Sequence, residues 1–251
     1  MSDIQRDVDD GVLTITLRRE ARMNALTHDM YVELTSILED ADNDDDVRSV
    51  VVRGSTRVFS AGNDLADFLV HPPREPDAPV WKFLQTLNRF KKPIVAAVCG
   101  LAVGIGMSAL LHMDVIVCSD DAKFAMPFVS LGVCPEAASS LLLPRTLGYQ
   151  RACELLLLGG TIDASRAEKF GIVNFVVPRD EVFALAESTA RKLAGLPNAA
   201  LIATRALLRD SDREDVAERI AIEADVFNAL LSKPEAQRAI ERFLQKKSKA
   251  S

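Results

Sequence analysis

The order of apolar and polar positions predicts an α/β core followed by a run of helices. Residues 11–17 alternate apolar and polar side chains, as a half-buried strand does, whereas residues 48–54 are almost continuously apolar, as in a strand covered on both faces. Apolar side chains recur at helical spacing over residues 24–41. Further strands are expected at 94–99, 114–119 and 172–176, and further helices at 80–90, at 105–112 and from 181 onward, with breaks at Pro197 and Pro234. The predicted division is an α/β core over residues 1–195 and a helical region over residues 196–251.

Two glycine-bearing turns follow predicted strands directly. Residues 59–65 read Phe-Ser-Ala-Gly-Asn-Asp-Leu, and residues 99–108 read Cys-Gly-Leu-Ala-Val-Gly-Ile-Gly-Met-Ser. Glycine has no Cβ, so the backbone amides of such turns can approach a ligand closely. The second turn also runs into a helix-like stretch, whose first amides have no partner within the helix. If the two turns meet, their amides form a pair of donors for a developing oxyanion, which favours an enzyme.

Composition and charge exclude several classes of protein. The chain has 251 residues, of which 48% are hydrophobic, which is enough for one well-buried domain with a helical appendage. No apolar run is long enough to span a membrane, and a net charge of −6 argues against nucleic acid as a partner. The first residues lack the pattern of a signal or transit peptide, and the last three do not match the peroxisomal signal. We therefore expect a cytoplasmic protein with no membrane contact.

The cysteines and histidines give no metal-binding pattern. Four cysteines occur without C-x-x-C spacing, mostly within apolar runs, and the three histidines are widely separated. The sequence therefore predicts small buried thiols in a reducing compartment and no metal site.

Five segments, in order along nearly the whole chain, resemble the crotonase family, the enoyl-CoA hydratase/isomerase superfamily. They are R-x-x-x-x-N-A-L at 19–26, F-S-A-G-N-D-L at 59–65, C-G-L-A-V-G-I-G at 99–106, D-V-I-V-C-S-D at 114–120, and G-I-V-N with the following V-P at 171–178. The resemblance implies a crotonase-like spiral of ββα units with a C-terminal helical trimerisation region. It also implies an acyl-CoA thioester as ligand, no further cofactor, and a homotrimer or hexamer.

The same resemblance implies roles for individual residues. The oxyanion-hole donors would be the backbone amides of Asn63 and Ile105. The family more often has a glycine where Ile105 stands, but an amide donates whatever its side chain. Substrate-binding positions implied around the turns and in the last helix are Arg22, Ala25, Ala61, Gly62, Asp64, Leu65, Gly104, Phe128, Phe243 and Lys246.

The catalytic carboxylates depart from the hydratase pattern. Hydratases of this family use two glutamates, which belong where this chain has Ser108 and Phe128. Water addition by that route would lack both its acid and its base. The stretch around Pro135-Glu136 instead resembles peroxisomal-type Δ3,Δ2-enoyl-CoA isomerases, in which the glutamate after the proline is the base. Glu136 is therefore the predicted catalytic residue of an isomerase that moves a double bond from 3-enoyl-CoA to 2-enoyl-CoA.

The sequence leaves alternatives open for the roles of single residues and for the function of the protein. Glu136 after a proline also fits the first turn of a helix, and Asp64 fits a helix N-cap. Residues 104–109 approximate a dinucleotide-binding fingerprint, but no acidic residue follows at the expected spacing. Other crotonase-type reactions, namely hydration, decarboxylation, C–C cleavage and dehalogenation, or a non-catalytic acyl-CoA-binding module, are the alternative functions.

Aromatic and apolar residues flank a proline-rich loop at residues 71–79. Each of these residues by itself is typical of a protein core. We hypothesise that together they form the wall of an acyl tunnel; they are Phe68, Leu69, Trp81 and Phe83.

Overall fold

Between residues 49 and 125, strands that follow one another in the sequence alternate between two sheets. The computed structural model describes residues 2–250, apart from the side chains of residues 210–212 and 246–250. The larger sheet has the order β1 (Ile4–Asp9), β2 (Val12–Leu17), β3 (Ser49–Arg53), β5 (Ile94–Val98), β7 (Val115–Ser119) and β10 (Phe175–Val177). The smaller sheet has the order β4 (Val58–Ser60), β6 (Leu101–Val103), β8 (Lys123–Ala125) and β9 (Ile162–Asp163). Each of β3, β5 and β7 is thus followed by a strand of the smaller sheet, and the chain advances as a spiral.

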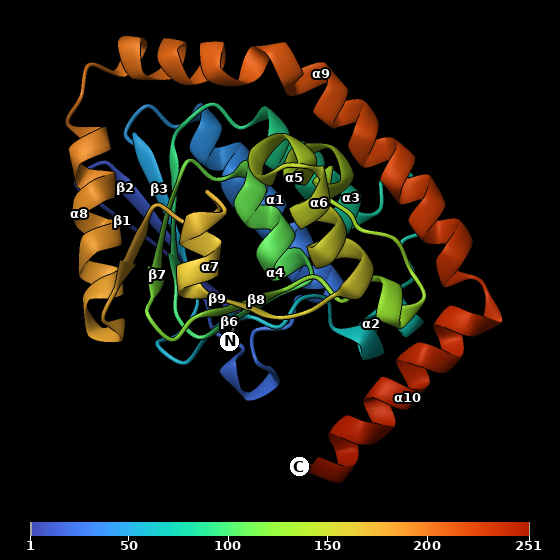
Figure 1. Ribbon diagram of the computed structural model, residues 1–251. Helices are drawn as coiled ribbons and strands as arrows, with labels where there is room; N and C mark the ends of the chain where they lie inside the picture. Colours follow the sequence, from blue (N-terminus) through green and yellow to red (C-terminus); the bar gives the residue numbers. More distant parts are fainter. Residues whose placement is uncertain (1, 251) are drawn as a thin grey trace.

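Helices cover both faces of the larger sheet (Figure 1). On one face, α8 packs against alternate side chains of the parallel strands, including Val51, Val95 and Val117. On the other face lie α1, α3 and the segment after β6. The helices are η1 (Glu20–Arg22), α1 (His28–Asn43), α2 (Leu65–Val70), α3 (Pro79–Arg89), α4 (Ile105–Ser108), η2 (Ala109–His112), η3 (Val129–Leu131), α5 (Ser139–Leu147), α6 (Tyr149–Cys153), η4 (Glu154–Leu158), α7 (Ala164–Lys169), η5 (Arg179–Glu181), α8 (Val182–Ala194), α9 (Asn198–Leu231) and α10 (Pro234–Ala250).

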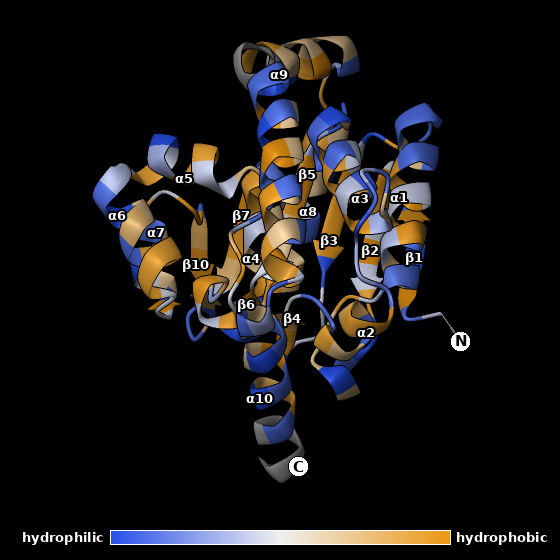
Figure 2. Ribbon diagram, turned by 90° about the vertical axis from the view of Figure 1, so that its right-hand side faces the viewer, coloured by the Kyte–Doolittle hydropathy of each residue, from blue (hydrophilic) through white to orange (hydrophobic). Residues whose placement is uncertain are grey.

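The long helix α9 runs across one end of the core and then along its side, where it reaches α10 (Figure 1). Its apolar residues Val216, Ile220 and Phe227 are buried in the main hydrophobic cluster. Hydrophilic residues predominate in the coloured part of α10, which projects away from the core (Figure 2). Within residues 2–250, no helix is both long enough and apolar enough to cross a membrane.

The predicted α/β class and the helical C-terminal part are confirmed, including breaks near Pro197 and Pro234. The predicted start of the first long helix at residue 24 is wrong, because α1 begins at His28 with Thr27 as its N-cap. The sequence reading also missed β1, whose residues beyond Ile4 are all exposed and therefore lack a hydrophobic pattern. The strand expected at 172–176 is β10, shifted to Phe175–Val177. All four cysteines are free thiols; Cys99 and Cys118 are buried as expected, whereas Cys134 and Cys153 are only partly buried.

Candidate active site

The two glycine turns meet because β4 and β6 are parallel neighbours, with an irregularity in the pairing between Val58 and Ser60. Ser60 pairs with Ala102, so the chain leaves both strands at the same edge of the smaller sheet. Gly62 and Gly104 each lie two residues beyond this pair. Both have positive φ values, of 90° and 56°, a region that glycine adopts without strain.

The close approach of the two turns explains the need for glycine at position 62. A Cβ placed on Gly62 would lie 2.7 Å from the carbonyl oxygen of Val103 and 3.6 Å from Cα of Gly104. Even alanine would therefore force the second turn to move. The predicted meeting of the turns is thus present in the structure.

Both predicted oxyanion-hole amides are available at this junction. Residues 62–64 pair with Leu26 as a short parallel bridge, in which Leu26 donates to Gly62 and Asp64 donates to Leu26. The amide of Asn63 therefore points to the other side, away from Leu26. Ile105 begins α4, so its amide has no partner within the helix. Within the described loops and turns, no backbone hydrogen bond uses either amide.

The motif at residues 19–26 holds the first glycine turn, residues 59–65, in place through the side chain of Asn24. Asn24 is fully buried and donates from Nδ2 to the carbonyl oxygens of Val58 and Phe59, both at 3.1 Å. Its Oδ1 accepts from the amide of Arg19. This use of Asn24 in tertiary hydrogen bonds is the physical reason why α1 does not begin at residue 24.

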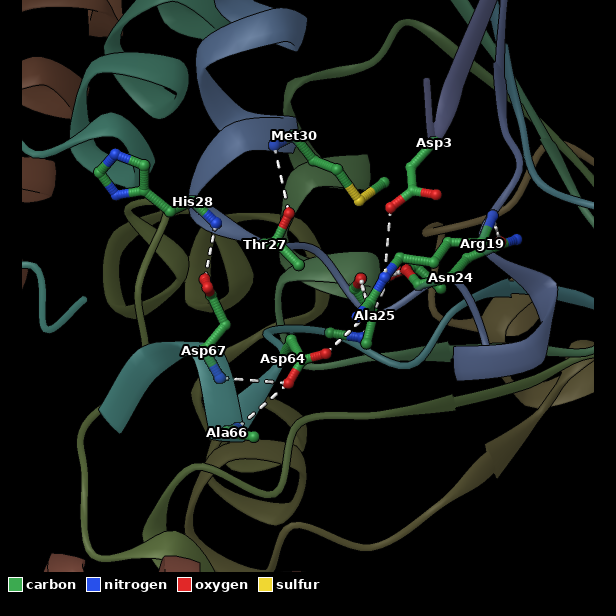
Figure 3. Close-up of polar contacts among 12 residues, drawn as sticks. Asp3, Arg19, Asn24, Ala25, Thr27, His28, Met30, Asp64, Ala66 and Asp67 are labelled. Atoms are coloured by element: carbon green, nitrogen blue, oxygen red, sulfur yellow. Dashed lines mark hydrogen bonds and ion pairs between the residues drawn. The ribbon is translucent and has the colours of Figure 1, made fainter. Parts of the chain in front are cut away.

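An ion pair and a helix cap hold the other side of the turn (Figure 3). Asp64 accepts from the amides of Ala66 and Asp67 at the start of α2, and its other oxygen lies 2.7 Å from Arg19 Nη1. The same Arg19 nitrogen donates to the carbonyl of Ala25. Burial raises the pKa of Asp64, but the Arg19 hydrogen bond and the cap amides outweigh it, so the net pKa is lowered. Asp64 is therefore an N-cap that positions the neighbouring Asn63.

A cavity of about 160 Å³ opens over the junction of the turns. Its walls contain most of the predicted substrate-binding residues together with apolar side chains of η3, α9 and α10. The lining residues include Ala25, Ala61, Gly62, Asn63, Asp64, Leu65, Phe68, Gly104, Phe128, Leu131, Val133, Phe227, Leu231 and Phe243. Such a largely apolar cavity with a few polar groups suits a small-molecule ligand.

The remaining predicted binding residues lie elsewhere. Arg22 is exposed and lines a separate surface hollow beside Asp64. The side chain of Lys246 lies outside the part that the structure describes. Of the proposed tunnel residues, only Phe68 lines the cavity, whereas Trp81 is core and its indole donates to Pro73.

Glu136 is completely buried, and both of its carboxylate oxygens lack a hydrogen-bond partner among the described residues. Burial raises the pKa of Glu136 to about 8, and the charge of Glu223 acts in the same direction. The side chain of Asn63, which lines the cavity, partly opposes this rise in pKa. A carboxylate with unpaired oxygens and a pKa near neutrality can accept and return a proton.

The backbone after Glu136 is strained. Ala137 and Ala138 have φ values of 61° and 55°, which alanine rarely adopts. The hydroxyl of Ser139 donates to the Glu136 carbonyl, and the imidazole Nε2 of His112 contacts the Ala137 carbonyl at 2.9 Å. Glu136 therefore precedes α5 on a tight, held turn and is not in the first turn of that helix. Strained backbone of this kind often occurs at functional sites.

Sequence reasoning missed two side chains that complete this environment. The hydroxyl of Tyr31, in α1, donates to Oδ1 of Asn63, and burial together with the charge of Glu136 raises its pKa well above 10.0. Glu223, in α9, is 5% exposed and acts on the pKa of Glu136. A signal was present for Glu223, because this carboxylate interrupts an otherwise apolar stripe of α9.

Residues 7–250 match the family model described as Enoyl-CoA hydratase/isomerase. The chain belongs to this family. It is 31% identical to the 1,2-epoxyphenylacetyl-CoA isomerase of Escherichia coli K12, over 99% of this chain and 97% of the relative. It is 32% identical to the 2,3-dehydroadipyl-CoA hydratase of the same organism, over 99% and 98% of the two chains. The solved structure of Pseudomonas aeruginosa OdaA is also similar, with 38% identity, a TM-score of 0.94, and coverage of 97% of this chain and 99% of OdaA. The predicted family and crotonase-like fold are thus confirmed.

Proposed function

We propose that this enzyme is a Δ3,Δ2-enoyl-CoA isomerase in which Glu136 moves the proton. The observation that carries the proposal is the fully buried carboxylate of Glu136, both of whose oxygens lack a hydrogen-bond partner among the described residues and whose pKa is influenced by the side chain of Asn63. The similar proteins include both an isomerase and a hydratase at nearly equal identity, so the residues of the site must distinguish them.

The two hydratase positions support isomerisation. Ser108, in α4, is buried and its hydroxyl has no hydrogen-bond partner within the described residues. Phe128 is buried and lines the cavity. Neither side chain can serve as the carboxylate that activates water or protonates the product.

The proposed reaction needs one base and one oxyanion hole. The Glu136 carboxylate takes a proton from C2 of the 3-enoyl thioester, and the electron pair moves onto the thioester oxygen to give a dienolate. The amides of Asn63 and Ile105 donate to that oxygen. Glu136 then returns the proton to C4, which leaves the double bond between C2 and C3. In comparable sites, each amide donor contributes about 3–4 kcal/mol to transition-state stabilisation, and a positioned base adds roughly 10²–10⁴-fold in rate.

The test compares two substrates and two proteins. The wild-type protein should convert 3-hexenoyl-CoA to the 2-enoyl product and should not hydrate crotonyl-CoA. Glu136→Gln should retain binding of the acyl-CoA and lose isomerisation by about 10²-fold or more. Hydration of crotonyl-CoA without isomerisation would instead establish a hydratase, and near-normal isomerisation by Glu136→Gln would reject Glu136 as the base.

We also propose that the chain forms a homotrimer, alone or paired into a hexamer. Consecutive leucines on α9, Leu207 and Leu208, are 80% and 77% exposed, and Leu157 and Leu158 after α6 are 63% and 78% exposed. Exposed apolar side chains in such groups are typical of protein contact surfaces. Light scattering tests this proposal, and a monomeric mass would contradict it.

A further inference from the structure

Helix α9 carries a second buried carboxylate to the candidate base. Glu223, Phe227 and Leu231 are spaced by four residues and therefore lie on one face of the helix. Phe227 and Leu231 line the cavity over the glycine turns. Glu223 thus occupies a position on an apolar, cavity-facing stripe, where an uncompensated carboxylate is costly.

Glu223 contacts the chain on both sides of Glu136. Its Oε1 accepts from the amide of Ser140 at 2.9 Å, just after the strained turn. Its backbone carbonyl accepts from the thiol of Cys134 at 3.5 Å, just before Glu136. Its other oxygen, Oε2, is buried without a hydrogen-bond partner among the described residues, as are both oxygens of Glu136.

We propose that Glu223 is a positioning residue for Glu136: it holds the loop from Cys134 to Ser140 from two sides and places a second carboxylate against the base. This role depends on the proposed function of Glu136, since only a proton-transferring group needs a tuned proton affinity. A neutral hydrogen-bonding side chain would hold the loop equally well. What the carboxylate adds to these loop contacts is a negative charge that acts on the pKa of Glu136.

The order in which the two carboxyl groups ionise determines whether Glu223 raises or lowers the pKa of Glu136. Burial raises the pKa of Glu223 to about 7, while the side chain of Ser140, the amides of Ser140 and Ala138, and the charge of Arg219 limit the rise. Glu136, with a pKa of about 8, then loses its proton beside an ionised Glu223, which disfavours a second negative charge. Other titratable or charged groups around the pair are Tyr31 from α1, with Asp67 acting on it, Cys134 in the loop, and His112 from η2 with Arg205 and Arg209 beside it.

Infrared difference spectroscopy against pH tests the proposal without using turnover. The carboxylic acid C=O band of Glu136 is assigned by its loss in Glu136→Gln. In Glu223→Gln, which retains an oxygen acceptor for the Ser140 amide, the midpoint of this band should move down by roughly one pH unit. The matched control Glu218→Gln removes a charge from an exposed position of α9 and should leave the midpoint unchanged.

A measurement of kcat against pH distinguishes a positioning role of Glu223 from a role in folding. The acid limb of the kcat profile of Glu223→Gln should move down by the same interval, with KM little changed. An unmoved infrared midpoint in a folded Glu223→Gln protein would overturn the proposal. If that variant does not fold, the wild-type protein tests the proposal, because two interacting carboxyl groups should lose their acid C=O bands in two separate steps, and loss of both bands in a single step would overturn it. Isomerisation by Glu136→Gln would refute the role of Glu136 as the base but not the interaction between Glu136 and Glu223. The failures of the two proposals are therefore distinguishable.

Discussion

The buried carboxyl of Glu136 should destabilise the folded protein as pH rises. In the folded state its pKa is about 8, against an ordinary value of 4.5. Between these two values the folded chain binds more protons than the unfolded chain, so the free energy of unfolding falls as pH increases through this window. Replacement of Glu136 by glutamine removes the ionisation and leaves a neutral side chain of the same shape. Glu136→Gln should therefore be more stable than wild type at pH 8 and nearly equal to it at pH 5.

The size of this effect follows from the displacement of the pKa. Each pH unit within the window corresponds to about 1.4 kcal/mol. The stabilising effect of Glu136→Gln should therefore grow by about 4 kcal/mol between pH 5 and pH 8, as an upper limit. For a domain of this size, the difference in Tm between variant and wild type should change by roughly 10 °C over the same interval.

Thermal unfolding at matched protein concentration measures this change. Wild type, Glu136→Gln and the exposed-charge control Glu218→Gln would each be followed by calorimetry at pH 5 and pH 8. The control should track wild type at both values, since Glu218 is exposed. A Tm difference between Glu136→Gln and wild type that is the same at both pH values would refute the reasoning, because it would mean that Glu136 ionises at an ordinary pKa.

Three further predictions concern catalysis. Gly62→Ala should lower kcat by about 10²-fold in the 3-hexenoyl-CoA assay, because its Cβ would lie 2.7 Å from the Val103 carbonyl and displace the amide donors; wild-type kcat would contradict the role of the turn. Tyr31→Phe removes the hydroxyl that donates to Asn63 and should lower kcat by roughly tenfold, about the worth of one such hydrogen bond, with KM little changed; an effect on KM alone would argue against it. Wild-type kcat should rise with pH through a midpoint near 8, since Glu136 must lose its proton to act as a base, and a flat profile from pH 6 to pH 9 would exclude this.

Local sequence identified most strands of the larger sheet and the chemistry of the turns, but it did not identify the smaller sheet, whose strands are only two or three residues long. The near-continuous apolar run of β3 and the helical spacing in α1 and α3 were recognisable because burial imposes a regular period on each element. Gly62 and Gly104 were recognisable because a positive φ leaves few choices of residue. The strand β1 was not recognisable from the sequence, since its residues beyond Ile4 are exposed and show no hydrophobic pattern.

Only the tertiary structure decided which groups surround the base. Glu136 looked like a residue in the first turn of a helix, yet it lies before a strained turn held by residues from other elements. Tyr31 and Glu223 come from helices far away in the sequence, and α9 brings Glu223 to the loop after crossing the core (Figure 1). Proton affinity depends on burial and on neighbouring charges in space, neither of which local sequence specifies. The sequence by itself therefore determined the family and the identity of the candidate base, and the packing of α1 and α9 determined the environment in which that base would act.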